Sequence, residues 1–305
     1  MNVISKYFYS KSAPVRGFIA FVFIGISCAS QAQEEVAKKY IVQEKPAQRE
    51  IENLIYNSTL GGFGKVKLYD TYLSPIEYEG FYINYNTERM KMKDMLNKKL
   101  AAQQILNVHL SFTDNTSKTS TRYSGFIDYS YGLLYRMQVH RRFKIFAGMQ
   151  ANGVLGFIYS DHSGNNPASA KAHISANLST ILVYDFNFLS LPLRAIYQVS
   201  SPFVGTVYAP DYGQSYYEIS EGNTKNIFHL SSYHNYLSLK NTIALEIPVR
   251  YMTLKLAYSY HAYESKIALN ETRMHSSGFM IGLSKEFFNV RKDKRNKAYY
   301  KRVFD

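Results

Sequence analysis

The feature that most limits how this chain can fold is a period of two in its side chains, sustained over long stretches. In residues 122–139, apolar and aromatic residues fall at odd positions, and most even positions hold polar residues or glycine. A β-strand with this period directs the two sets to opposite faces of a sheet. The same alternation fills 101–113, 227–247, 251–264 and 273–288.

The length of these runs distinguishes two classes of β protein. Soluble strands average about 5–6 residues, whereas alternation here continues for roughly 12–18 residues. A tilted membrane strand takes about 9–11 residues, so we expect strands that cross a membrane and project beyond it. A soluble β-sandwich is the alternative, because its sheets also have one apolar face.

The connections between the runs alternate in length. Short ones fall near 140–142, 187–190 and 248–250, with a somewhat longer one at 94–99. Long polar ones fall at 114–120, 161–170, 201–226 and 263–272. Tight periplasmic turns and longer extracellular loops are typical of outer-membrane barrels.

We therefore predict an all-β fold, a transmembrane antiparallel up-and-down β-barrel over residues 51–288, with about ten strands and 8–12 allowed. An even number returns both termini to the periplasmic side. The composition fits, because 28 Tyr and 19 Phe supply the aromatic girdles that flank the apolar band of such barrels. The predicted strands are 53–69, 77–92, 101–113, 122–139, 143–160, 171–186, 190–200, 227–247, 251–264 and 273–288.

Residues 1–32 have the three parts of a secretory signal peptide. Basic residues precede the apolar run 17–28, and Ser30-Gln31-Ala32 offers small residues for cleavage between Ala32 and Gln33. An uncleaved N-terminal anchor is the alternative. Cys28, the one cysteine, would be lipidated in a lipoprotein, although Gly25-Ile26-Ser27 is a poor match. A mature chain without thiols excludes disulfides and thiolate chemistry.

Charge concentrates in the C-terminal tail. The formal net charge of +13 falls to +10 when the three basic residues of the leader are removed, and residues 289–305 carry +5 of it. Because an exported chain rarely meets nucleic acid, we expect a solvated basic periplasmic tail or one that contacts anionic lipid or cell wall. The polar stretch 33–50 is a periplasmic lead-in.

One parity of the predicted strands places charges of both signs on the inner wall. Such residues could form a ligand or catalytic site, or could pair with one another to fill the barrel. The interior of an eight-stranded barrel is just filled by side chains, whereas a barrel of 16–18 strands leaves an aqueous channel. A barrel of about ten strands therefore predicts a narrow or occluded lumen. The lumen candidates are Glu88, His109, Asp128, Arg136, Arg194, Lys240 and Glu246.

The connection 201–226 is the most distinctive local stretch, because it is rich in tyrosine, glycine and proline. We expect it either to fold over the barrel mouth as a lid or to bind an extracellular ligand, since tyrosine gives large amphipathic contacts. The candidate residues are Tyr212, Gln214, Tyr216, Tyr217 and Glu218.

No motif for catalysis, metal or cofactor is present. Ser215 lies near Asp211, His229 and His234 in the sequence, but it lacks the G-x-S-x-G pattern of a nucleophile elbow. The remaining histidines have no metal-ligand spacing. The sequence predicts no catalytic residue, no metal and no cofactor.

Two segments resemble an uncharacterised bacterial outer-membrane β-barrel family, known as domain of unknown function 3316. They are 70–80 (DTYLSPIEYEG), followed by Glu88-Arg89, and 212–219 (YGQSYYEI). The resemblance implies a signal-bearing outer-membrane barrel and brings no catalytic residues.

We expect an integral outer-membrane protein that is not an enzyme and acts in surface binding or in narrow small-solute passage. A barrel-embedded acyl hydrolase and a structural barrel that links membrane to wall are the alternatives. The expected partners are outer-membrane lipid, the export and barrel-assembly machinery and an extracellular ligand at loop 201–226, with no nucleic acid.

Overall fold

The computed structural model describes residues 54–93, 95–97, 99–162, 167–188, 191–211, 214–222, 226–249 and 252–288. These residues belong to one compact unit, Gln48–Asp305. The predicted leader 1–32, its cleavage at Ala32-Gln33, lead-in 33–50 and tail 289–305 lie outside them and stay predictions. Within the described ranges, no helix has the length and apolar character needed to cross a bilayer.

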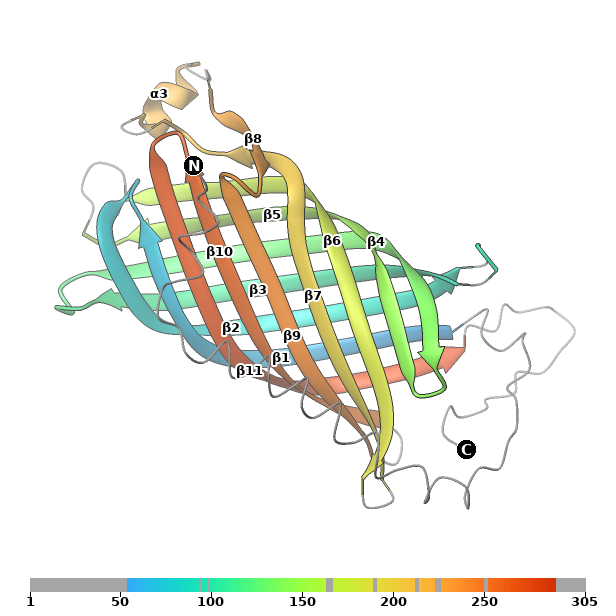
Figure 1. The fold of residues 1–305 in the computed structure, drawn as a ribbon. Helices are drawn as coiled ribbons and strands as arrows, with labels where there is room; N and C mark the ends of the chain where they lie inside the picture. Colours follow the sequence, from blue (N-terminus) through green and yellow to red (C-terminus); the bar gives the residue numbers. More distant parts are fainter. Residues whose placement is uncertain are drawn as a thin grey trace, which may run out of the picture. The chain divides into compact units, whose positions relative to one another are not determined.

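Ten antiparallel strands form a closed barrel (Figure 1). Each strand pairs with its neighbours in sequence, and β1 pairs with β11 to close the ring. The barrel strands are β1 Leu54–Asp70, β2 Ser74–Lys93, β3 Leu100–Asn115, β4 Thr121–His140, β5 Phe143–Ser160, β6 Ala168–Phe188, β7 Leu191–Tyr208, β9 Tyr236–Val249, β10 Met252–Ile267 and β11 Asn270–Phe288. The short strand β8, Phe228–Ser232, pairs with the last part of β7.

We call the end of the barrel where β1 begins and β11 ends the terminal end. The opposite end, from which segment 209–227 leaves, is the lid end. The predicted strands are confirmed, with boundaries that differ by a few residues. Two expected long connections are wrong: 201–208 belongs to β7, and 263–272 is mostly strand with a tight turn at Ala268-Leu269.

The predicted strand 227–247 is interrupted, which makes β8 and β9 separate strands. Val204 and Ser200 lie four residues apart in β7, whereas their partners Ser232 and Lys240 lie eight apart. The surplus residues form a turn, in which the Asn235 side chain accepts from the Ser232 amide at 2.9 Å. The interruption is therefore a large bulge, and such irregularities re-aim side chains at barrel rims.

Polar side chains face the inside of the barrel and apolar side chains face outward, as the prediction of a membrane barrel requires. On β4, Arg122, Ser124 and Asp128 point inward and are buried, while Ile127 and Tyr129 point outward and are about half exposed. A β-sandwich would bury its apolar face instead. The soluble alternative is wrong for this chain.

Glycines let neighbouring strands approach at the closing seam. A Cβ on Gly282 of β11 would lie 1.9 Å from the Thr59 carbonyl oxygen of β1, whereas one on Gly61 would meet nothing within 4 Å. Both glycines lie in the same β1–β11 pairing.

We predict that Gly282→Val weakens the seam by about 1–3 kcal/mol, because the new side chain forces β1 and β11 apart. Loss of the folded, heat-modifiable band on cold electrophoresis would measure this. Gly61→Val is the matched control and should fold normally. Equal behaviour of the two variants would contradict the explanation.

Candidate functional site: the lumen and its lid

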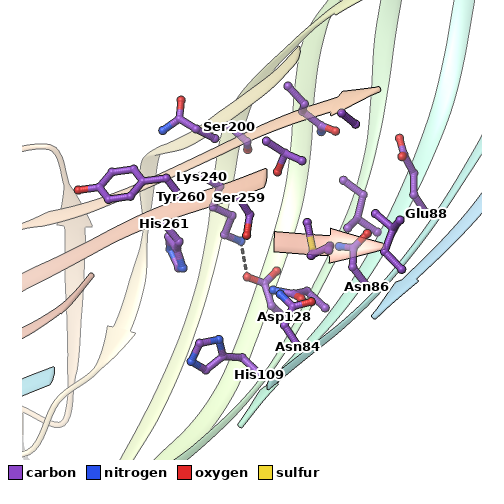
Figure 2. A pocket seen from close by; sticks show the side chains of 18 of the residues that line it. Asn84, Asn86, Glu88, His109, Asp128, Ser200, Lys240, Ser259, Tyr260 and His261 are labelled. Atoms are coloured by element: carbon purple, nitrogen blue, oxygen red, sulfur yellow. Dashed lines mark hydrogen bonds and ion pairs between the residues drawn. The ribbon is translucent and has the colours of Figure 1, made fainter. Parts of the chain in front are cut away.

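An ion pair crosses the middle of the lumen. Lys240 on β9 and Asp128 on β4 point toward each other, although the two strands lie on different walls of the barrel (Figure 2). Asp128 also accepts from the Asn152 amide at 2.7 Å. The two charges therefore neutralise each other and tie the opposite walls together.

A second bridge joins β10 to β2. Lys255 lies 3.2 Å from Glu88 and donates to the Tyr56 hydroxyl at 2.8 Å. Tyr56 in turn donates to Glu246 at 2.6 Å. The side chain of Lys255 is almost fully buried, so its charge is stabilised by these partners and not by bulk water.

Three glutamines extend this polar layer across the barrel. Gln103 donates to Glu88 at 2.5 Å and accepts from Gln150 at 2.7 Å. Gln198 on β7 lies 3.4 Å from Gln103 on β3. The layer is a connected network whose donors and acceptors satisfy one another.

Nearer the terminal end, Arg194 is surrounded by carboxylates. It contacts Asp185 at 2.7 Å, Glu246 at 3.6 Å and also Glu286. Lys144 contacts Asp185 from the other side at 2.7 Å. Two basic groups thus face three carboxylates in this cluster, and Glu246 also accepts from Tyr56.

Apolar side chains close the lumen on the lid side of the ion pair. They form one cluster, although they come from β1, β2, β5 and β11. Because β5 lies across the barrel from β1 and β11, the cluster reaches from wall to wall. Its members are Val66, Leu68, Tyr78, Tyr82, Ile158 and Met274.

Two further clusters lie on either side of the Lys255–Glu88 bridge, the first toward the terminal end and the second toward the lid end, and Ile196 of β7 packs against both. Together they involve strands from every part of the wall. The first contains Met92, Ala101, Leu134, Phe146, Ile181 and Val183, and the second Leu60, Ala244, Ala257 and Met280. Apolar side chains therefore lie on both sides of the Lys255–Glu88 bridge, and the second cluster lies between the levels of Lys255 and Lys240.

A polar cavity of about 110 Å³ remains beside the Lys240–Asp128 pair. Asn84, Asn107 and His109 line one wall, and His261 and Lys240 line another. Among the residues that the structure describes, Asn84 Oδ1, Asn107 Oδ1 and His109 Nε2 have no hydrogen-bond partner. With about 30 Å³ per molecule in the liquid, the cavity has room for a few waters that would satisfy these atoms.

The structure divides the predicted lumen residues into three groups. Glu88, His109, Asp128 and Lys240 line the cavity. Arg194 and Glu246 meet in the carboxylate-rich cluster nearer the terminal end. Arg136 joins neither, because its guanidinium donates to Gln138 two residues along β4.

Sequence reasoning missed Lys255, Gln103 and Tyr56, which are central to the polar layer. Lys255 stands between Leu254 and Leu256, so the same alternation could have identified it as an inward residue. Nothing local marks Tyr56, whose importance comes from Glu246 and Lys255 on distant strands.

The described part of segment 209–227 is tied to three places around the mouth. The Tyr216 hydroxyl accepts from the Ala170 amide of β6 at 2.5 Å. Tyr72, in the β1–β2 turn, donates to the Gln214 carbonyl at 2.8 Å, and Asn270 of β11 donates to the Pro210 carbonyl at 2.8 Å. This described part therefore lies across the mouth as a lid, which is one of the two arrangements expected for the segment.

The predicted lid residues have different environments. Gln214 is buried, and the Tyr216 ring packs edge-on against Tyr72 at 5.8 Å. Burial raises the pKa of both tyrosine hydroxyls above its ordinary value. Tyr217 is 74% exposed. Tyr212 lies outside the described residues.

Glu218 has a local structural role in the short helix α3, Tyr216–Ser220. Ser215 accepts from the Glu218 amide at 3.2 Å, and the Glu218 carboxylate accepts from the Ser215 amide at 2.9 Å. This reciprocal pair is a capping box. It explains why the serine and the glutamate stand three residues apart.

The hydrolase alternative has no assembled triad to support it. Ser215 caps α3, His229 bonds to the Ala209 carbonyl at 3.1 Å, and His234 bonds to the Ser232 hydroxyl at 2.5 Å. Each group thus has a separate partner. Among the residues that the structure describes, no cluster of three His, Cys, Asp or Glu could hold a metal ion.

We predict that Lys240→Met lowers the free energy of unfolding by about 3 kcal/mol, because it leaves the Asp128 carboxylate without its partner. Adding Asp128→Asn should restore most of the loss. Urea unfolding in detergent micelles measures both. Lys266→Met, which breaks the exposed pair with Glu271, is the control and should change stability by less than about 1 kcal/mol.

We predict that Tyr72→Phe loosens the lid without unfolding the barrel, since it removes one hydrogen bond worth about 1 kcal/mol. Backbone hydrogen exchange over residues 214–222 should accelerate by about fivefold, while exchange in β1 and β2 stays unchanged. Tyr233→Phe, at an exposed tyrosine, should have no effect. Unchanged exchange in the Tyr72 variant would show that other contacts hold the segment.

The chain is similar to several solved structures. The transport unit of the autotransporter AIDA-I from Escherichia coli is 9% identical, with 82% of this chain and 93% of that chain covered and a TM-score of 0.40. The Escherichia coli outer membrane protease OmpT is 6% identical, with 77% and 97% covered and a TM-score of 0.40. The translocator domain of the autotransporter NalP from Neisseria meningitidis is 6% identical, with 87% and 96% covered and a TM-score of 0.38.

No curated protein matches the sequence. The model of one family, described as Protein of unknown function (DUF3316), matches residues 19–294. The match covers most of the 305 residues, and the strands, the seam and the lid described above fall within it. The chain belongs to the DUF3316 family.

Proposed function

We propose that this protein is a closed barrel of the outer membrane that carries a binding surface on its extracellular side and conducts no solute. The observation that carries the proposal is the filling of the lumen. Apolar clusters lie on the lid side and on the terminal side of the polar layer, and the luminal carboxylates contact basic groups. A solute would have to displace both the apolar clusters and the ion pairs to pass through the lumen.

The orientation follows from the connections. The longest connection, 209–227, leaves the lid end, and the turns at the terminal end are short. Outer-membrane barrels place short turns in the periplasm and long loops outside. The terminal end is therefore periplasmic in this proposal, so the basic tail 289–305 would lie in the periplasm.

Exposed apolar residues at the lid end support a binding role. Leu269, in the β10–β11 turn, is 94% exposed, and Tyr217 on α3 is 74% exposed. Ala268 and Leu269 both have positive φ, at 54° and 63°, where glycine or asparagine would be less strained. A position exposed only to water favours neither an apolar side chain nor a backbone with positive φ in a residue other than glycine. The exposed leucine in this strained turn therefore indicates a contact surface.

Narrow solute passage is the second candidate, and the cavity beside Lys240 is the feature that favours it. The cavity would have to connect through the apolar clusters to both ends. The lipid-acting enzyme has less support, because Ser215, His229 and His234 have separate partners. The wall-linking role depends on residues 289–305, outside the described part.

We predict that the reconstituted protein shows no discrete conductance steps in planar bilayers. A variant without residues 214–222 should also stay closed, because the apolar clusters lie below the lid. A wide porin reconstituted in the same way is the positive control. Discrete steps whose ion selectivity changes in Lys240→Met would refute the proposal and support passage through the lumen.

A further inference from the structure

Four basic side chains gather on the outer surface of the barrel at the terminal end. They occupy outward positions on the two strands that pair with β1, and they are Arg89, Lys91 and Lys93 of β2 and Lys285 of β11. Arg89 and Lys285 both lie opposite Asn57 of β1, so the four positions adjoin one another. We call these four residues the basic patch.

No carboxylate compensates the basic patch. Among the described residues, no ion pair or hydrogen bond joins any of its four side chains to another group. The described carboxylates near this end point into the lumen and contact basic groups there; they are Glu88, Asp185, Glu246 and Glu286. Like charges on neighbouring strands destabilise a sheet, so a counter-charge from outside the chain would stabilise the patch.

The same strands carry charges of both signs at the lid end. Lys67 of β1 pairs with Glu79 of β2, and Arg273 of β11 lies 3.3 Å from Glu271. The lack of carboxylate partners is therefore a property of the terminal end and not of these strands.

The position of the basic patch along the strands places it at the edge of the lipid. Between Glu79 and Arg89 the outward residues of β2 carry no charge, and the interval 80–88 has nine positions. This matches the length of about 9–11 residues with which a tilted strand crosses a membrane. On β11 the outward apolar residues end at Leu283, one outward position before Lys285. The patch therefore lies at the level of the lipid headgroups.

The basic patch is confined to one side of the barrel wall. On β4 and β5 the outward strand positions near the terminal end hold Met137, Val139 and Ile145. Lys99 and Arg141 lie in turns, beyond the strand ends. A general interfacial belt would place basic residues on all strands, so their concentration beside β1 indicates a local site.

Arg89 and Lys285 are placed to hold one anion between them. Neighbouring strands are about 4.8 Å apart, so the two residues, on either side of β1, are about 10 Å apart at Cα. Both side chains are long enough to meet above Asn57. A guanidinium and an ammonium are the groups that proteins use to bind phosphate. Toward the middle of the bilayer lie the exposed side chains of Tyr85 and Ile281, against which acyl chains would pack.

We propose that the basic patch binds an anionic glycerophospholipid from the leaflet at the terminal end, with one phosphate between Arg89 and Lys285. Lys91 and Lys93 would contact the part of the headgroup farther from the bilayer centre. The inference rests on the proposed function only for the assignment of this leaflet to the periplasmic side. It is independent of whether the lumen conducts.

Lipid titration of the full chain in mild detergent, followed by native mass spectrometry, tests the proposal. We expect phosphatidylglycerol to bind more tightly than phosphatidylcholine, whose headgroup has no net charge. Arg89→Gln combined with Lys285→Gln should weaken phosphatidylglycerol binding at least tenfold, because each basic group at a membrane surface contributes about fivefold. Lys67→Gln combined with Lys266→Gln removes the same charge at the lid end and is the matched control. Heat-modifiability on electrophoresis checks that both variants fold.

Three outcomes of the titration would overturn the proposal: equal binding of the two lipids, equal weakening by the two double variants, or binding of lipopolysaccharide to the patch that is tighter than that of phosphatidylglycerol. The third would also reverse the orientation used in the proposed function. Conductance steps in planar bilayers would contradict the proposed function and leave the lipid site unaffected.

A fluorescence measurement locates the lipid, since the chain has no tryptophan. Thr59→Trp introduces one beside the patch, and Leu133→Trp introduces one on β4 in the same row as Lys91. The vesicles contain equal parts of phosphatidylglycerol and phosphatidylcholine, one of them brominated on its acyl chains. We expect brominated phosphatidylglycerol to quench Thr59→Trp more strongly than brominated phosphatidylcholine does, and the two to quench Leu133→Trp equally. Equal quenching of Thr59→Trp by the two lipids would refute the site.

Discussion

The structure depends on one requirement, that backbone hydrogen-bonding groups within a bilayer be paired inside the protein. The β1–β11 seam meets it by pairing the first strand with the last, from Leu54 with Phe288 to Asp70 with Thr272. Closure removes every free sheet edge from the ring. It also gives each strand one face toward lipid and one toward the lumen, so the period of two in the sequence is a direct consequence of closure.

The second consequence of closure is a limited interior that must be filled. Outward positions are apolar, so the inward ones are largely polar, and charges placed there are unstable unless they are paired. Lys240 with Asp128 and Lys255 with Glu88 solve this by bridging different walls. Near the lid, Lys171 contacts the fully buried Asp70 at 2.9 Å. Apolar clusters occupy further levels, so the interior combines polar layers with packing like that of a protein core.

The strands were predictable because alternation is a local property that each segment displays by itself. The turn at Ala268-Leu269 was not, since neither residue is the glycine or asparagine that positive φ favours. The bulge between β8 and β9 does have a local signal in the sequence. Outward residues fall at even positions in β8, such as Leu230, and at odd positions in β9, such as Leu237, so the phase of the alternation shifts between them.

The site was predictable only in part, because alternation is local whereas the contacts within the lumen join distant strands. Alternation assigns a side chain to the inner wall but does not say which residue faces it across the lumen. It therefore identified Asp128 and Lys240 as inward without pairing them, and it included Arg136, whose partner is the neighbouring Gln138. The lid illustrates the same limit. Tyr216 looked like a binding residue, and its role in packing appears only when Tyr72 and Ala170 come close in space.

In the proposed function the lid and the lumen have separate roles, because an apolar cluster lies in the lumen beneath the lid. A lid over an open channel would have to move, whereas this segment is fixed from three sides by Tyr72, Ala170 and Asn270. Fixing the backbone of a loop in advance reduces the conformational entropy that is lost when its side chains bind a partner. In the proposed binding role, these three contacts suit the described part of the segment to present Tyr217, which is 74% exposed.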